Sequence, residues 1–166
     1  MPSKLKLIEK FSGPNASVYS VLVKTAADTP PELLVDRFIQ RNVSYYEPEL
    51  MDIARRLRSL GNITGCTENF FKLDEGLEAH DMVCALYDEP DREMRLYCIR
   101  LSTQILIIGD GGPKRTRTWQ EDGQLKSAVH EMMHVSKIVR TKLNDGSLRI
   151  SSSGLMFEGD LFISRT

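Results

Sequence analysis

Residues 95–118 read RLYCIRLSTQILIIGDGGPKRTRT, and this stretch joins the most apolar part of the chain to its most basic part. Two short apolar runs, 96–101 and 105–108, predict a β-hairpin in the interior of a sheet. The second run leads through a glycine-rich segment into three cations, Lys114, Arg115 and Arg117. Several cations at the end of one hairpin favour phosphate oxygens as ligands. The alternative is a solvated charged rim on an ordinary sheet.

The composition sets limits on the kind of protein. The chain has 166 residues, 41% hydrophobic and 27% charged, which predicts one domain with a single substantial core. The formal net charge is -1, so a nucleic-acid ligand needs a local cationic patch. Residues 92–118 supply such a patch, because six Arg or Lys residues there outnumber Glu93 and Asp110.

The cysteines and the N-terminus indicate the compartment. Cys66, Cys84 and Cys98 form an odd set without CxxC spacing, which argues against a disulfide framework or a metal site. The N-terminal MPSKLKLIEKF alternates polar and apolar residues, and no run has the length needed to cross a bilayer. We therefore expect a reduced, cytoplasmic protein without a signal peptide, a membrane span or a membrane partner.

The first half of the chain predicts a β-hairpin followed by two helices. The hairpin strands are expected over 5–11 and 17–24. The first helix is expected to begin at Pro31 and to end near Asn42, and the second to extend from Glu47 to Gly61. Both helices are expected to pack as a helical hairpin on one face of the sheet.

The second half predicts a meander, a helix and a terminal β segment. Strands at 70–73 and 82–87 precede the two central strands, so four consecutive segments give an antiparallel meander. A last helix is expected to begin at 119–122 and to bury a stripe that includes Leu125, Val129 and Met132. Residues 146–166 are expected to add one or two further hairpins.

Residues 130–134 spell HEMMH, an HExxH pattern inside the predicted last helix. In a zinc hydrolase this spacing places two imidazoles on one metal, with the glutamate as general base. At about 100° per residue, however, His130 and His134 point away from the apolar stripe and are expected to face water. Glu158 is the only acidic third ligand at a suitable separation. A zinc hydrolase stays as an alternative, and the favoured hypothesis needs no metal or other cofactor.

The order of strand, two helices, meander and helix, with basic residues at the meander's edge, resembles the RelE/ParE superfamily of toxin-antitoxin toxins, in particular its HigB-like branch. Four stretches resemble a Bacteroidetes-type subgroup that is often encoded beside a helix-turn-helix protein. They are FFKL (70–73), VCALYD (83–88), residues 95–122 and the FEGDLF tail. The resemblance covers nearly the whole chain.

The resemblance implies an α+β fold and a domain plan. Residues 1–145 are expected to form a RelE-like antiparallel sheet with a two-helix hairpin and a C-terminal helix. Residues 146–166 are expected to form a C-terminal β-hairpin extension of the same domain.

The resemblance also implies a function. The chain is expected to be the toxin of a type II toxin-antitoxin system, a metal-independent endoribonuclease that cleaves mRNA, free or on the ribosome. Its expected partner is a helix-turn-helix antitoxin. In such toxins the ribose 2′-hydroxyl attacks the adjacent phosphate, and protein cations neutralise the developing charge.

The resemblance assigns catalytic roles to three residues. Arg95 occupies the position of the strand arginine in the family's YRxxY pattern. Lys114 and Arg115 match the basic pair that follows the next strand.

Three further residues are expected to bind RNA. Lys72 matches the basic residue that enters the meander, Tyr97 is placed to contact a base, and Arg117 is placed to hold a flanking phosphate. The family's Tyr or His near the chain end has no counterpart after His134. A non-catalytic protein-interaction module of the same fold therefore remains the second hypothesis.

Overall fold

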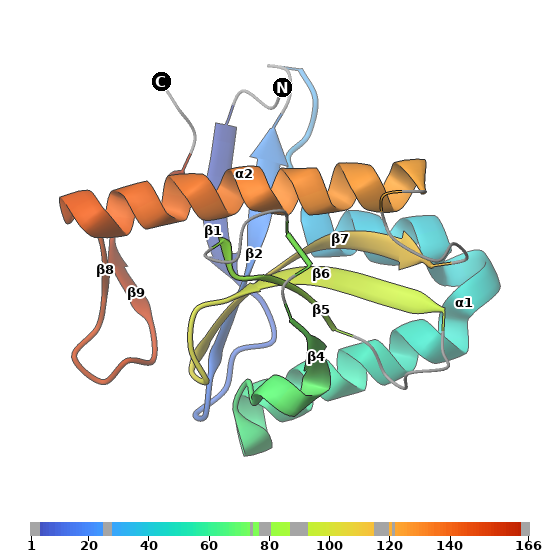
Figure 1. Cartoon of the computed structure of the whole chain (residues 1–166), viewed down its shortest axis with the longest axis horizontal. Helices are drawn as coiled ribbons and strands as arrows, with labels where there is room; N and C mark the ends of the chain where they lie inside the picture. The colour runs from blue at the N-terminus through green and yellow to red at the C-terminus, as the bar shows by residue number, and fades with distance from the viewer. Residues whose placement is uncertain are drawn as a thin grey trace.

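A computed structural model describes residues 4–24, 28–73, 75–76, 81–86, 93–114, 120 and 122–163. The elements follow in the order β1 (Lys4–Glu9), β2 (Ser17–Lys24), β3 (Glu32–Leu33), α1 (Leu34–Ser59), β4 (Phe71–Lys72), β5 (Val83–Leu86), β6 (Met94–Arg100), β7 (Ile105–Pro113), α2 (Gly123–Asp145), β8 (Leu148–Ile150) and β9 (Phe157–Gly159). A π-helical turn (Leu60–Thr64) and a 3-10 turn (Glu68–Phe70) connect α1 to β4. The expected α+β class is confirmed (Figure 1).

The main sheet has the strand order β1-β2-β7-β6-β5-β4, with β3 also paired to β2. The predicted meander is confirmed, because β4 through β7 pair as consecutive antiparallel neighbours. The opening hairpin joins this meander through a parallel pairing of β2 with β7. At the opposite edge, the backbone of Leu161 and Ile163 hydrogen-bonds to β1, so residues 161–163 cover that edge.

Each face of the sheet is covered by one long helix, α2 on one side and α1 on the other (Figure 1). The side chains of the central strands alternate between the two faces. Tyr97, Ile99, Ile105 and Ile107 pack with α2, whereas Leu96, Cys98, Leu106 and Ile108 pack with α1. Strands that are buried on both faces read as continuous apolar runs, which is why the sequence identified this hairpin.

The two predicted helices are the two halves of α1. Tyr46 has non-helical backbone angles (φ -130, ψ 26) and Pro48 lies two residues later, where its ring and missing N–H interrupt the helical hydrogen bonds. The two halves leave this bend in different directions (Figure 1). The expected start at Pro31 is wrong, because Glu32 and Leu33 pair with β2 and the helix begins at Leu34.

The last helix and the terminal hairpin are confirmed. The Asp122 side chain caps α2 by accepting a 3.0 Å hydrogen bond from the Leu125 backbone N–H. Gly146 ends the helix with a φ of 83°, a left-handed conformation that favours glycine. Strands β8 and β9 form one hairpin, and the ring of Phe157 packs 5.0 Å from that of Tyr19.

Strand β7 is longer than expected, because the glycine-rich segment continues the ladder with β6 up to Pro113. The register shifts between Leu96 and Cys98, so β7 bulges there. A Cβ atom on Gly111 would overlap the carbonyl oxygen of Arg95. A Cβ atom on Gly109 would overlap the sulfur of Met132 on α2. The absence of side chains at these two positions lets β6 and α2 approach β7 closely.

Candidate functional site

Two strands, β4 and β6, place polar side chains on the α2 face of the sheet. Lys72 on β4 lies opposite Ala85 on β5, which lies opposite Tyr97 on β6. Directly opposed residues project from the same face of a sheet. Arg95 shares this face, because it precedes Tyr97 by two residues on the same strand. The side chains of Lys72, Arg95 and Tyr97 therefore belong to one surface.

Lys114 joins this surface from β7. Its backbone N–H donates a 2.7 Å hydrogen bond to the carbonyl of Glu93, which extends the ladder past Pro113. Burial lowers the pKa of Lys114, and the nearby ammonium of Lys72 and guanidinium of Arg95 lower it further, whereas Glu75 opposes them. The positive charges of Lys72 and Arg95 therefore both act on Lys114, and a bound anion would relieve this repulsion.

Glu75 supplies a buried carboxylate beside these cations, and only 8% of the residue is exposed. Its backbone N–H donates to the carbonyl of Val83, and its carboxylate lies 3.6 Å from the Lys72 ammonium. The sequence analysis did not identify Glu75, because it lies in a polar segment without periodicity. Its place between two strands of the meander was the only available signal.

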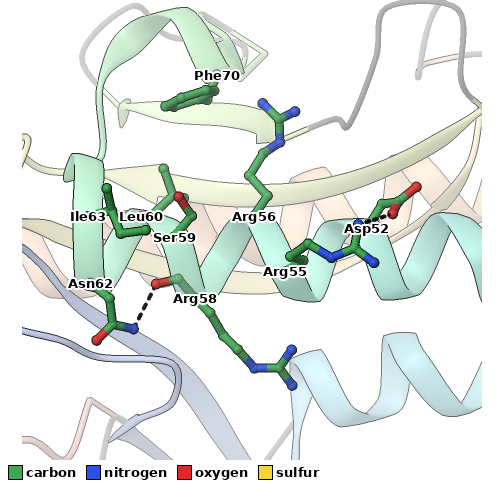
Figure 2. A pocket seen from close by; sticks show the side chains of 9 residues that line it. All are labelled: Asp52, Arg55, Arg56, Arg58, Ser59, Leu60, Asn62, Ile63 and Phe70. Atoms are coloured by element: carbon green, nitrogen blue, oxygen red, sulfur yellow. Dashed lines mark hydrogen bonds and ion pairs between the residues drawn. The ribbon is translucent and has the colours of Figure 1, made fainter.

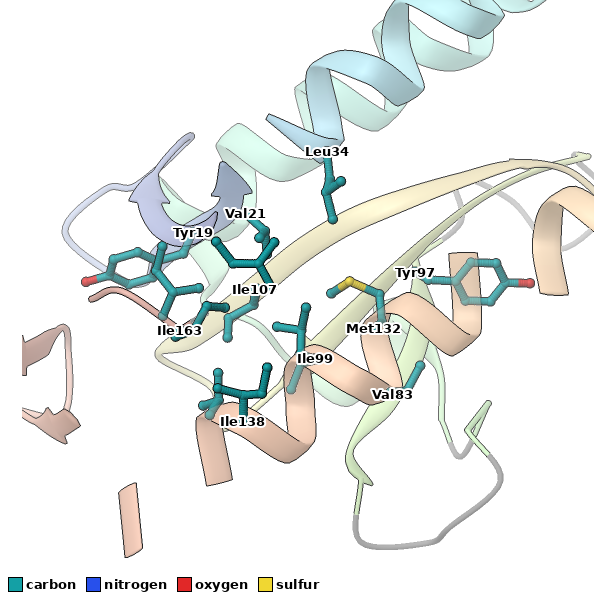
Figure 3. Packing of buried hydrophobic residues seen from close by; sticks show 14 of the residues in the cluster. Tyr19, Val21, Leu34, Val83, Tyr97, Ile99, Ile107, Met132, Ile138 and Ile163 are labelled. Atoms are coloured by element: carbon teal, nitrogen blue, oxygen red, sulfur yellow. The ribbon is translucent and has the colours of Figure 1, made fainter. Parts of the chain in front are cut away.

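Tyr97 contributes a hydroxyl group at the edge of the α2-side core. The residue is fully buried, and its hydroxyl has no hydrogen-bond partner among the described residues. Figure 3 shows the ring packed with the apolar cluster and the hydroxyl pointing away from the other labelled side chains. Burial raises the pKa of Tyr97, and Glu75 raises it further. A buried donor without an acceptor costs about 1–3 kcal/mol, so a ligand oxygen that accepts from it would recover that energy.

The N-terminus of α2 lies beside the same surface. A Cβ atom on Gly112 would contact Gln124 and Leu125 at 3.5 and 3.6 Å, and Gln124 donates a 3.4 Å hydrogen bond to the carbonyl of Gly111. The charge of Asp122, the capping residue, also raises the pKa of Tyr97. The N-terminus of a helix attracts anions, so its dipole adds to the cations.

Four of the six predicted site residues thus lie together: Lys72, Arg95, Tyr97 and Lys114. The other two, Arg115 and Arg117, lie outside the described residues. We call the four residues, together with Glu75, the sheet-end site. It can bind an anion, accept a proton at Glu75 and donate one from Lys114.

Two substitutions in the sheet-end site are expected to move the pKa of Lys114 in opposite directions. Lys72→Met should raise it, because a neighbouring positive charge is lost, and Glu75→Gln should lower it, because a negative charge is lost. An NMR titration of the Lys114 side chain measures both shifts. Lys137→Met on α2 is the matched control, and shifts of the same sign in both variants would contradict the arrangement.

A separate network of charged side chains joins β7 to both helices. Asp110, only 1% exposed, accepts hydrogen bonds from Arg37 (2.9 Å) and from two nitrogens of Arg41 (2.8 and 2.9 Å). Arg37 also donates to Glu131 on α2 at 3.0 Å. Two cations and two anions balance each other, so this network is structural. The i,i+4 spacing of Arg37 and Arg41 on a predicted helix was its only sequence signal.

The HExxH residues do not form a metal-binding set. His130 is exposed as expected, but His134 is half-buried, and both line a cavity of about 310 Å³ with Leu5 and Leu34. Burial raises the pKa of Glu131, which Arg37 opposes through their ion pair. Within the described ranges, no three His, Cys, Asp or Glu side chains are placed to share a metal ion. The third ligand that a zinc hydrolase needs is therefore missing from this part of the chain.

No family model, curated protein or solved structure matches this chain. Neither of the described helices combines the length and apolar character that crossing a bilayer requires.

Proposed function

We propose that this chain is a metal-independent endoribonuclease and that the sheet-end site binds the scissile phosphate. The observation that carries the proposal is the convergence of Lys72, Arg95 and Lys114 on a buried carboxylate and on a buried hydroxyl that has no acceptor among the described residues. Guanidinium and ammonium groups bind phosphate oxygens through charge-assisted hydrogen bonds. They also stabilise the additional negative charge that develops during transfer.

RNA fits this site better than other phosphate esters because it carries its own nucleophile. Among the described residues that form the sheet-end site, Tyr97 alone carries a hydroxyl, and its raised pKa makes it a poor nucleophile. The three cysteines are buried in the core under α1. The ribose 2′-hydroxyl supplies the missing nucleophile, and DNA, which lacks it, should not be cleaved.

In the proposed reaction Glu75 accepts the proton of the 2′-hydroxyl as its oxygen attacks the adjacent phosphorus. The bond from phosphorus to the 5′ oxygen breaks, and Lys114 donates a proton to that leaving oxygen. Its lowered pKa makes it a stronger acid than an ordinary lysine. Arg95 and Lys72 bind the non-bridging oxygens, and Tyr97 donates a hydrogen bond to one of them. The products are a 2′,3′-cyclic phosphate and a 5′-hydroxyl.

The resemblance of residues 95–122 to RelE/ParE toxins supports a specific setting for this activity. We propose that the substrate is mRNA, free or on the ribosome, and that a helix-turn-helix antitoxin holds the enzyme inactive. A reading frame for such a protein beside the gene would support this setting.

Lys114→Ala tests the proposal directly. The substitution should reduce RNA cleavage by about 10²-fold or more and relieve the growth arrest that the wild type causes when it is expressed without an antitoxin. Cleavage is measured on purified protein with a chelator present, with and without ribosomes, by following the 2′,3′-cyclic phosphate. Lys137→Ala, an exposed lysine on α2, is the matched control.

Equal cleavage by wild type and Lys114→Ala would contradict the role of the sheet-end site. Absence of cleavage by the wild type in every condition would instead favour the non-catalytic interaction module.

A further inference from the structure

A second cationic surface lies on the α1 side of the sheet. A hollow of about 650 Å³ is lined by the last two turns of α1, the π-helical turn and Phe70 (Figure 2). Arg56 extends toward Phe70, Arg55 extends toward Asp52, and Arg58 extends away from Phe70, whereas Leu60 and Ile63 form the apolar part of the lining. We call it the arginine hollow, and it shares no residue with the sheet-end site.

The positive charge of the arginine hollow is only partly neutralised. Asp52, the one acidic residue among the described residues that line it, accepts a 2.7 Å hydrogen bond from a single nitrogen of Arg55. Arg58 lies over the ring of Phe11 at 5.7 Å and has no carboxylate partner among the described residues. A guanidinium has five N–H donors, so both arginines keep donors for an anion.

Aromatic and apolar groups lie between these charges. The Arg56 guanidinium stacks 4.9 Å from the ring of Phe70, which is half-buried, and Ile63 is 72% exposed. Cations beside an aromatic ring and an apolar surface are the combination that binds single-stranded nucleic acid, because phosphates pair with the cations while bases stack on the ring.

The position of the arginine hollow relates it to the sheet-end site. Phe70 lines the hollow at the end of the 3-10 turn, and Lys72 of the sheet-end site follows two residues later on β4. Phe71 between them is buried in the α1-side core. Strand β4 is the edge of the sheet, so the two cationic surfaces lie on either side of one edge.

We propose that the arginine hollow binds the flanking single-stranded segment of the same RNA whose scissile phosphate lies in the sheet-end site. The strand passes over the β4 edge, with phosphates on Arg55 and Arg58 and a base against Phe70 and Ile63. This inference rests on the proposed function. An acidic peptide could also pair with the arginines. RNA is favoured because a chain of net charge -1 gathers cations on both sides of β4, along the path of one continuous polyanion.

The test compares two substrates in one protein. The first is a dinucleotide that reaches only the sheet-end site, and the second is a longer unpaired RNA with the same cleavage step. Arg55→Glu/Arg58→Glu should raise KM for the longer RNA on the order of tenfold or more and leave dinucleotide cleavage unchanged. For this variant, the slope of the logarithm of RNA affinity against the logarithm of salt concentration should fall by the equivalent of about two phosphate contacts. Lys137→Glu/Arg149→Glu, with the same charge change on exposed residues, is the control.

The outcomes separate this inference from the proposed function. If KM for the longer RNA is unchanged in Arg55→Glu/Arg58→Glu while Lys114→Ala still loses cleavage, the role of the arginine hollow in RNA binding is wrong and the proposed function stands. Failure of the wild type to bind or cleave either RNA would overturn both. If Arg55→Glu/Arg58→Glu loses the binding of polyglutamate but keeps the binding of RNA, the arginine hollow binds an acidic protein, and the inference is wrong.

Discussion

Replacing Glu75 by Gln is expected to reduce RNA cleavage by a factor of about 10² to 10⁴, the usual contribution of a general base. Glutamine keeps the shape of the side chain but cannot accept the proton of the 2′-hydroxyl. The affinity for RNA should stay the same or rise, because a negative charge beside Lys72 and Lys114 is removed. Single-turnover cleavage gives the rate, and anisotropy with a 2′-O-methyl RNA gives the affinity.

Glu158→Gln serves as the control for this variant, because Glu158 is exposed on β9. Cleavage by Glu75→Gln within about threefold of the wild type would exclude Glu75 as the base. Equal losses of rate and RNA affinity would instead indicate that Glu75 only holds the site together, since a base acts in the chemical step.

Replacing Asp110 by Asn is expected to lower the free energy of unfolding by about 3 kcal/mol. Breaking a buried ion pair commonly costs about 3–5 kcal/mol because a charge is left unpaired. The lower end applies here, since the side chains of Arg37 and Arg41 are 32% and 36% exposed and water can reach them. Urea unfolding measures the change through the midpoint and the m-value.

Asp36→Asn is the matched control for Asp110→Asn. Asp36 forms a 3.6 Å ion pair with Lys10, and both side chains are more than a third exposed, so its loss should change stability by less than about 0.5–1 kcal/mol. Equal losses in the two variants would show that the Asp110 network contributes no more than a surface pair.

The sequence predicted most elements because their signals are local. The strands of the central hairpin read as apolar runs, since both of their faces are buried. Helix α2 was predicted from the spacing of Leu125, Val129 and Met132, together with Asp122 and Gly146 at its ends. The bend in α1 followed from Pro48, because a proline in the interior of a helix interrupts its hydrogen bonds.

The candidate site was predicted less completely. Lys72, Arg95 and Tyr97 came from the resemblance, and Lys114 also from the cations that follow the central hairpin. The common surface of Lys72, Arg95 and Tyr97 follows from strand register, and the ladder bond of Lys114 to Glu93 brings Lys114 beside them. Glu75 was missed, because a single acid in a polar segment has no pattern. The partners of Asp110 were missed as well, since Arg37 and Arg41 lie 73 and 69 positions away in the sequence.

The sequence by itself determined which segments are strands and which are helices, because hydrophobic periodicity, caps and proline act within a few residues. Only the tertiary structure decided that β2 runs parallel to β7, that Lys114 lies near Lys72 and Glu75, and that the arginine hollow borders the edge strand β4. Each of these depends on how distant segments pack against one another. Contacts of that kind are settled by the whole core at once and leave no local pattern in the chain.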